Sequence, residues 1–487
     1  MKISIRNFKC VEQLTGFPIK SINILAGANS GGKRSIIQAI LLIKQSLEAA
    51  AQDSPLKLNK PYISLGRFES LIRKQADEKI LKLALHLEED DLAPRLRQLM
   101  FPAKRPTRHA PEPRVDGFKE LVVEVAFRRP TDRVVVNDFK ITINASETHT
   151  LRLSREPHGH SHKLVSNAPD VFFQFDKPLR RELAKAGSDG LQVDAIFNSF
   201  FPALIEAKDP PGASQGHFYS DIIGLARASL TNYFRRISYL GPLRDEPHEY
   251  YHQDDDLITR VGNRGENAAF LLAKDATTKI SYKTLSPPGG QKTGPSEKSG
   301  KLATAVNYWF CDVFGLAAEI KVQTTKTNRD LFTVAIKNAA GFSTPITQVG
   351  FGVSQVFPIL VEGLRPASGK RLIILEQPEI HLHPRVQAAL FDFIRLSGED
   401  VAFLIETHSD HFITRMRRRI AEDQENTLAE KINLTFVEGD GASANYRQIE
   451  ISEMGIFESW PTGFFDQADN DLRALIKAQA SKRRAGV

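Results

Sequence analysis

The sequence predicts an α/β protein with a parallel or mixed sheet as its core, an antiparallel β region and an inserted helical arm. Apolar strand patterns alternate with helical patterns from 346 to 421, which is typical of a parallel sheet flanked by helices. Near the N-terminus, an apolar strand at 22–27 ends in glycine, and a helical pattern follows. Between 78 and 165, alternating apolar and polar residues indicate successive antiparallel strands.

Composition places the chain among ordinary globular proteins. With 487 residues, 41% of them hydrophobic and 25% charged, it is long enough for two or three subdomains. The only cysteines are Cys10 and Cys311, so no disulfide framework is expected. We find no signal peptide and no apolar run long enough to cross a bilayer, so a soluble cytoplasmic protein with no membrane partner is expected. The net charge of +7 permits contact with nucleic acid but is spread over the chain.

We expect four regions. Residues 1–165 form an N-terminal lobe that holds the glycine-ended strand and the antiparallel subdomain, and residues 166–238 form the inserted helical region. Residues 239–440 form a C-terminal lobe, within which 285–300 lacks apolar residues beyond its first and is predicted to be a mobile loop. Residues 441–487 form a C-terminal extension.

The stretch "GANSGGKRSII" predicts a phosphate-binding loop between a strand and a helix. Gly27 and Gly32-Lys33 keep the G-x-x-x-x-G-K spacing, but Arg34 stands where Ser or Thr is usual. Backbone N–H groups at a helix N-terminus bind phosphate oxygens, and Lys33 would reach the terminal phosphates. The predicted nucleotide contacts in this loop are Gly27, Asn29, Ser30, Gly31, Gly32, Lys33, Arg34 and Ser35.

Acidic and amide side chains follow the apolar strand in "RLIILEQPEIHLHP". Glu376, Gln377 and Glu379 come just beyond its end. A carboxylate fixed there by a buried strand can hold Mg²⁺ directly or through water, and we assign that role, through water, to Glu376. A polar turn after a core strand is the simpler alternative.

The next strand, in "FLIETHSDHF", ends at His408. A lone histidine is usually a structural hydrogen-bonding group, but one at the tip of a neighbouring parallel strand can donate to a γ-phosphate. The histidines of "HLHP" and "THSDH" also suggest a transition-metal site, which we set aside because no cysteine accompanies them.

These motifs, in the order "NFKC", "GANSGGKRS", "VGFGVSQVFPIL", "LEQPEIHLHP" and "ETHSDH", resemble the ABC-type ATPases of the SMC and RecF-like group, often called AAA-family ATPases. The sequence is most similar to ATPase subunits of bacterial anti-phage systems such as Septu and certain retrons. The resemblance covers most of the chain, including "YLGPLRDEP" at 239–247, and is weakest from 95 to 235.

The resemblance implies roles for individual residues. Gly27, Gly32 and Lys33 match the Walker A loop, Glu376 the Walker B acid, and His408 the switch histidine. Gln377 stands where such heads carry a catalytic glutamate, and "IHLHP" matches the D-loop. In such proteins two heads sandwich ATP, with Mg²⁺, between the Walker loop of one and the signature segment of the other, so a homodimer or higher oligomer is implied. The signature residues by this resemblance are Gly350, Gly352, Ser354 and Gln355.

Two departures point to slow hydrolysis. A guanidinium at Arg34 cannot ligate a cation, although it could clamp phosphate, and Ser35 lies one residue further round the helix. The amide of Gln377 can orient water but cannot accept its proton, which leaves Glu379 as a substitute base. The catalytic candidates are Glu376, Gln377, Glu379 and His408.

Three functional hypotheses follow. The first is an ATP-binding, slowly hydrolysing subunit that oligomerises and regulates a partner effector, such as a nuclease, in anti-phage defence. The second is a degenerate scaffold that nucleotide stabilises, and the third is a RecF-like DNA-maintenance ATPase that contacts nucleic acid. No long heptad pattern supports an SMC-like coiled coil.

Overall fold

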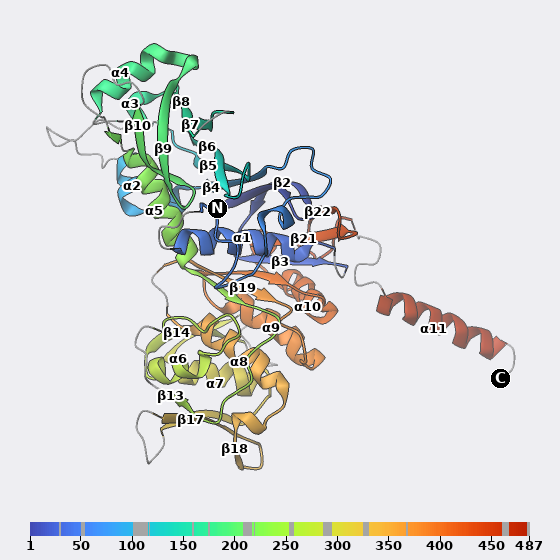
Figure 1. Cartoon of the computed structure of the whole chain (residues 1–487). Helices are drawn as coiled ribbons and strands as arrows, with labels where there is room; N and C mark the ends of the chain where they lie inside the picture. The colour runs from blue at the N-terminus through green and yellow to red at the C-terminus, as the bar shows by residue number, and fades with distance from the viewer. Residues whose placement is uncertain are drawn as a thin grey trace. The chain divides into compact units, whose positions relative to one another are not determined.

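The computed structural model of the chain, drawn in Figure 1, separates into two compact units. Unit 1 contains Met1–Ile19, Arg34–Ile237 and Gly439–Asn445; unit 2 contains Lys20–Lys33, Ser238–Glu438 and Tyr446–Val487. The structure describes residues 1–28, 31–49, 54–100, 115, 117–157, 160–173, 176–207, 217–218, 220–252, 258–285, 295–324, 331–366, 369–459 and 467–484.

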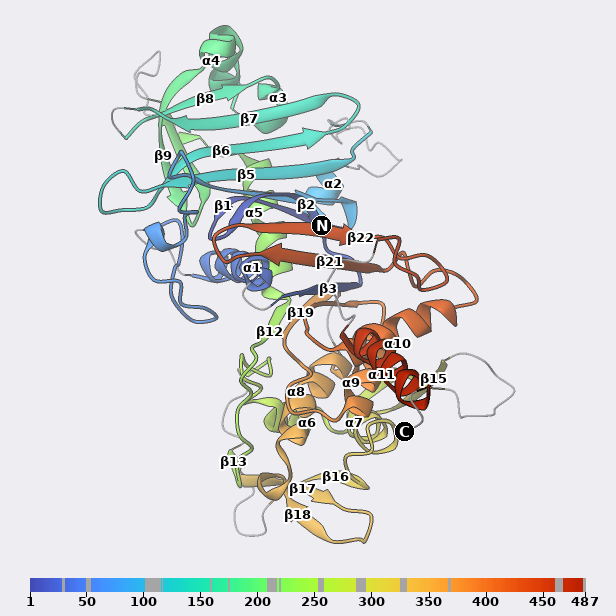
Figure 2. The same cartoon turned by 90° about the vertical axis from the view of Figure 1, so that its right-hand side faces the viewer.

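Unit 1 is built on antiparallel strands in the order β11-β10-β9-β8-β7-β6-β5-β4-β1-β2, each paired antiparallel with its neighbours (Figure 2). The prediction of antiparallel strands between 78 and 165 is therefore confirmed. Alternation buries one row of side chains, such as Phe139, Ile141 and Ile143 on β6. The strands are β1 (Lys2–Phe8), β2 (Val11–Pro18), β4 (Leu81–Leu87), β5 (Glu120–Arg128), β6 (Val135–Asn144), β7 (Thr148–Arg155), β8 (His162–Ser166), β9 (Leu191–Asn198), β10 (Phe201–Ala207) and β11 (His217–Phe218).

Helices of unit 1 pack against these strands, with α3 against β7, α4 against β8 and β9, and α5 against β10. The segment 166–238, which was predicted to be an inserted helical region, contributes β9, β10 and β11 in addition to its helices. The alternating pattern of "LQVDAIFN" pairs as a strand, and the helical period of α5 drew attention away from it. The helices are α1 (Lys33–Glu48), α2 (Pro94–Met100), α3 (Pro169–Phe172), α4 (Lys177–Ala186) and α5 (Asp221–Arg235).

Unit 2 contains the predicted parallel sheet, in the order β21-β3-β20-β19-β12. Strand β3 pairs parallel with β21 on one side and β20 on the other, and β20 pairs parallel with β19. All six residues of β19 are buried, as expected for a strand covered on both faces. The strands are β3 (Ile22–Gly27), β12 (Ile237–Leu240), β19 (Arg371–Glu376), β20 (Val401–Glu406), β21 (Ile432–Gly439) and β22 (Ala444–Ile449).

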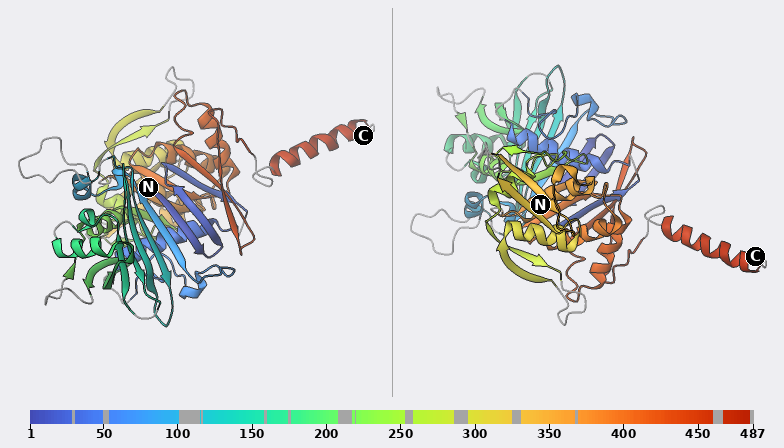
Figure 3. Two further views of the ribbon diagram at one scale, coloured as in Figure 1. Left: turned by 90° about the horizontal axis from the view of Figure 1, so that it is seen from above. Right: turned by 90° about the horizontal axis from the view of Figure 1, so that it is seen from below.

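The helices of unit 2 enclose an apolar core that includes Trp309, which meets Phe393 edge-on with ring centroids 5.2 Å apart. The alternation of α8, β19, α9, β20 and α10 confirms the pattern predicted for 346–421. Among the described residues, no helix is both long enough and apolar enough to cross a bilayer. The helices are α6 (Ala268–Asp275), α7 (Leu302–Asn307), α8 (Phe351–Leu364), α9 (Pro384–Leu396), α10 (Asp410–Ala421) and the C-terminal α11 (Gln467–Arg484; Figure 3).

Short antiparallel strands complete unit 2. The predicted mobile loop 285–300 is wrong in its last part, because Ser296–Lys301 forms β15 and pairs with β14 (Lys279–Thr284). Backbone pairing needs no apolar side chains, so the polar composition misled the prediction. Residues 286–294 lie outside the described residues. The other short strands are β13 (Tyr251–His252), β16 (Glu319–Thr324), β17 (Leu331–Lys337) and β18 (Ser343–Pro345).

Candidate nucleotide site

The glycine-rich loop follows β3 at the carboxyl edge of the parallel sheet. Gly27 has a φ of +139°, and a Cβ atom there would collide with the Val437 carbonyl oxygen on β21. Gly32, directly before α1, has a φ of +103°. Both positions favour glycine, the first because backbone approaches closely and both because L side chains rarely adopt these angles. The loop therefore leads from β3 to Lys33, the first residue of α1, in the order that a phosphate-binding loop has.

Lys33 is folded back onto its own loop. Its Nζ atom donates to the carbonyl oxygens of Gly27, at 3.0 Å, and of Ala28, at 2.7 Å, and the residue is only 3% exposed. Burial lowers the pKa of the Lys33 amine, while the charges of Glu406 and Glu379 oppose that shift. A bound phosphate would compete with the two carbonyl oxygens for this ammonium group.

Glu376 ends β19 in a buried position, 2% exposed, beside Glu406 at the end of β20. The hydroxyl of Tyr239, on β12, donates to Glu376 Oε1 at 2.8 Å. The two neighbouring strands thus place two carboxylates at one sheet edge, as the sequence predicted for Glu376. Glu406 was not among the predicted site residues, although it ends an apolar strand in the same way as Glu376.

Arg244 is a charged residue that sequence reasoning did not assign to the site. It is 6% exposed, and its Nη1 atom donates to the Gly241 carbonyl oxygen. Burial lowers the pKa of Arg244 to about 10, and the charges of Tyr239 and Glu376 oppose this shift. The available signal was the turn "GPLRD" directly after the buried strand β12, a polar strand end like those after β19 and β20.

Glu379 and His408 are held together by the backbone. The amide of His408 donates to Glu379 Oε1 at 2.6 Å. Burial raises the pKa of Glu379, and the hydrogen bond from His408 partly offsets that rise. Burial also lowers the pKa of His408, and the nearby charge of Lys33 lowers it further. The structure therefore brings Lys33, Glu379 and His408 into one charge cluster, and their roles toward nucleotide stay a prediction.

Gln377 directly follows β19 and forms a bend in the backbone. Its backbone has a left-handed φ of +44°, and its amide donates to the Glu406 carbonyl oxygen at 2.8 Å. The turn that Gln377 makes lets Glu379, two residues later, approach His408. Of these two residues, Glu379 is the one whose side chain contacts His408, through the His408 amide.

The signature segment begins α8. Gly350 is exposed at the helix N-terminus, with open space where a Cβ atom would lie. Gly352 packs beside the "IHLHP" turn, where an added Cβ would lie 3.3 Å from the His381 carbonyl oxygen. Ser354 and Gln355 are buried, at 7% and 6% exposure. Of these two residues and Gly350, only Gly350 is exposed.

Four predicted loop residues have other outcomes. Asn29 and Ser30 lie outside the described residues. In unit 1, Arg34 is exposed, and the Ser35 hydroxyl lies 3.2 Å from the Cys10 sulfur. The Ser35 hydroxyl thus contacts Cys10, and Ser35 was not expected to replace the missing metal ligand.

The residues of unit 2 fit a nucleoside triphosphate better than a protein-held metal ion. The loop and Lys33 supply donors for phosphate oxygens. In the described part of the chain, no three His, Cys, Asp or Glu side chains group as a metal site. Mg²⁺ characteristically takes one or two carboxylates plus substrate phosphates and water, so Glu376 could hold it once nucleotide is bound.

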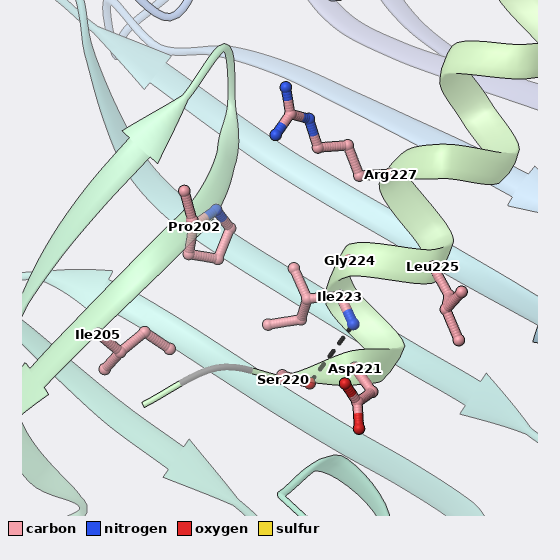
Figure 4. A pocket seen from close by; sticks show the side chains of 9 residues that line it. Pro202, Ile205, Ser220, Asp221, Ile223, Gly224, Leu225 and Arg227 are labelled. Carbon is pink, nitrogen blue, oxygen red and sulfur yellow. Dashed lines mark hydrogen bonds between the residues drawn. The ribbon is translucent and has the colours of Figure 1, made fainter. Parts of the chain in front are cut away.

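A cavity of about 360 Å³ in unit 1 offers no comparable chemistry. It lies between β10 and α5 and is lined by Pro202, Ile205, Ile223 and neighbours, with Asp221 and Arg227 at its margin (Figure 4). The Ser220 hydroxyl there caps α5 by accepting from the Ile223 amide, so its polar group already has a structural role.

Comparison with protein families assigns the class of the chain. Residues 138–414, more than half of the sequence, match the family AAA_21, described as "AAA domain, putative AbiEii toxin, Type IV TA system". The chain therefore belongs to this family of ATPase domains. The match includes Arg244, Glu376, Glu379 and His408 but not the loop at 27–35, whose assignment rests on its own motif and geometry.

A second family, described as a protein of unknown function, DUF3696, matches residues 429–475. A search of curated proteins finds no significant match. Residues 429–475 include β21, β22 and the start of α11.

Solved structures with detectable similarity include SMC head domains. One is the SmcHead bound to the C-winged helix domain of ScpA, with 11% identity, a TM-score of 0.38 and coverage of 92% of this chain and 97% of that one. Another is the SMC head domain from Thermotoga maritima, with 10% identity, a TM-score of 0.33 and coverage of 92% and 98%. Both TM-scores are below 0.5, and the fold class rests on the strands and helices of the chain itself.

Proposed function

We propose that this protein is an ATP-binding, slowly hydrolysing ATPase subunit of the ABC type, which self-associates around nucleotide and regulates a separate effector protein. The observation that carries the proposal is the Lys33 ammonium held at the glycine loop between the charges of Glu379 and Glu406. An ammonium already at the loop needs only to exchange carbonyl oxygens for phosphate oxygens.

Self-association is supported by the first turn of α8. Gly350 leaves the helix N-terminus open, and no acidic side chain lies in that turn. A helix N-terminus attracts phosphate, so a second copy of the chain could present this turn to nucleotide held at Lys33. We therefore propose that two copies complete two nucleotide sites.

Control of an effector is supported by the family description, which names a toxin of a toxin–antitoxin system. A toxin–antitoxin system has two components, and we propose that the second component here is an effector such as a nuclease, acting in anti-phage defence. Co-purification of the protein with the product of an adjacent gene, dependent on ATP, would support this arrangement. If the protein is expressed together with the products of the adjacent genes and no such complex can be purified, that result would count against this arrangement.

Slow hydrolysis is supported by Arg34 and by the position of Gln377. The test is single-turnover hydrolysis of radiolabelled ATP with Mg²⁺ by the native chain, Lys33→Ala and Arg34→Ser. Hydrolysis by the native chain that is abolished in Lys33→Ala supports the proposal. An equal rate in native protein and Lys33→Ala would show that the phosphate release comes from elsewhere.

A nucleotide-stabilised scaffold is the second candidate, favoured by the Ser35 hydroxyl being engaged by Cys10. It predicts nucleotide that survives purification without phosphate release.

The DNA-maintenance reading is weaker, because Arg415 and Arg419 of the basic cluster 415–419 pair with the buried Asp392. These ion pairs hold the two arginines against α9. Nucleic acid binding stays a prediction, and a steep loss with salt would test it.

A further inference from the structure

Arg244 is a buried cation with unused donors. Among the described residues, its buried Nε and Nη2 atoms have no hydrogen-bond partner, while Nη1 donates to the Gly241 carbonyl oxygen. A guanidinium buried with unsatisfied donors is costly, and the fold tolerates it where a ligand or strong local field compensates. The turn that carries Arg244 is held by backbone hydrogen bonds from Gly241 to Asn263 and from Asp245 to Arg264.

The position of Arg244 is inside the candidate site. Its charge acts on Tyr239 and on Glu376, and Tyr239 in turn holds Glu376 Oε1. Glu376 lies beside Glu406, whose charge acts on Lys33. Arg244 and Lys33 therefore act on two neighbouring carboxylates, Glu376 and Glu406 respectively, from different elements of unit 2.

We propose that Arg244 is a second anion-binding side chain of this site and contacts the terminal phosphate of bound ATP; the inference rests on the proposed function. The Nε and Nη2 atoms form one edge of the guanidinium, and that edge matches two phosphate oxygens. Because Arg34 replaces the usual hydroxyl ligand of Mg²⁺, Arg244 also supplies positive charge that the metal would otherwise contribute. ATP binding at this site then depends only weakly on Mg²⁺.

The alternative is that Arg244 only balances the charge of Glu376. In that case its removal would disturb the whole site and would weaken ATP and ADP alike. Contact with the terminal phosphate instead predicts a selective loss for ATP, because ADP lacks that group. Selectivity between the two nucleotides therefore separates a ligand contact from a structural role.

The experiment measures ATP and ADP affinity by calorimetry, with Mg²⁺ and with excess EDTA, for the native chain, Arg244→Gln and Arg244→Lys. The native chain should keep its ATP affinity in EDTA to within about threefold. Arg244→Gln should lose about tenfold or more in affinity for ATP, but less than about threefold in affinity for ADP. Arg244→Lys keeps the charge but not the two-donor edge and should fall between them.

Arg371→Gln is the matched control. Arg371 is also a buried arginine with lowered pKa, but it lies at the opposite end of β19 from Glu376. Its replacement should lower thermal stability and leave the ratio of ATP to ADP affinity unchanged. If Arg244→Gln does not fold, Arg244→Lys provides the same comparison.

Equal losses for ATP and ADP in the Arg244 variants, or native binding of ATP that vanishes in EDTA, would overturn the inference. Unchanged ATP affinity in Arg244→Gln, together with lost affinity in Lys33→Ala, would remove Arg244 from the site and leave the proposed function standing. No binding of ATP by the native chain would remove both.

Discussion

At the scale of single residues, Lys33 and Glu379 share one charge network. The Lys33 ammonium is satisfied by loop carbonyl oxygens, and the carboxylate of Glu379 accepts from the amide of His408. Phosphate binding would draw Lys33 away from the carbonyl oxygens and add negative charge beside Glu379. The proton affinity of Glu379 should therefore rise when nucleotide binds, as a general base requires.

Replacement of Glu379 by Gln should stop hydrolysis and spare binding. An amide accepts the hydrogen bond from the His408 backbone but cannot take a proton from water, so single-turnover hydrolysis should fall by about a hundredfold or more. Gln377→Glu is the matched variant, and it should leave the rate within about threefold of native, because the left-handed turn does not bring residue 377 to His408. The opposite ranking of the two variants would move the base to position 377.

The same Glu379→Gln variant should be more stable than the native chain at neutral pH. Burial raises the folded pKa of Glu379 above 4.5, so the folded state binds its proton more tightly than the unfolded state. Ionised Glu379 therefore lowers the free energy of unfolding above the folded pKa, and this penalty disappears as pH falls to below the unfolded value. Thermal unfolding at about pH 7.5 and about pH 4 measures the effect. A gain that is equal at both pH values would contradict the assigned cause.

ATP affinity should depend on the protonation of His408. Burial and Lys33 hold its pKa below 6.5 in the free protein, and a bound phosphate raises that pKa. Binding then takes up a proton between the two pKa values, so affinity falls as pH rises through that range. Titration of ATP affinity against pH should show a shallower slope in His408→Asn, which keeps a donor but does not titrate. Parallel slopes in the two proteins would place the proton uptake on another group, such as Glu379 or the nucleotide itself.

At the scale of elements, α8 offers an N-terminus that is tolerant of substitution. Gly350 has a φ of −59° and open space around its Cβ position, so Asp or Asn at this position should cap the helix and preserve stability. Gly350→Asp should nevertheless prevent nucleotide-driven self-association, because its charge would repel the phosphates of nucleotide bound to the other copy. Gly350→Asn is the uncharged control. Sedimentation with ATP compares them, and equal self-association would remove α8 from the interface.

Elements also show what sequence patterns could and could not predict. The parallel strands β3, β19 and β20 were predictable, because each is an apolar run that ends in glycine or in polar residues. Strands β9 and β15 were not, since β15 is polar and β9 is short beside stronger helical signals. Tyr239 and Arg244 were missed for a different reason: their part in the site depends on β12 lying next to β19, which is a tertiary fact.

At the scale of the whole molecule, the proposal requires two copies of the chain. Gly350 is exposed at the start of α8, and in the proposal two copies would provide both halves of each nucleotide site. Light scattering should report monomer without nucleotide and twice that mass with ATP for the Glu379→Gln variant, which binds but does not turn over. A monomer under both conditions, with ATP demonstrably bound, would contradict the two-copy arrangement.

The most direct test of the account is ATP binding by the native chain and by Lys33→Met, which removes the charge of a side chain that is only 3% exposed and keeps much of its volume. If the glycine loop binds nucleotide, the native chain should bind one ATP saturably, and Lys33→Met should lose about a hundredfold in ATP affinity. Thermal unfolding curves should show that both proteins are folded. Equal affinity in the two proteins, or no binding by native protein, would contradict the assignment of the glycine loop as a nucleotide site.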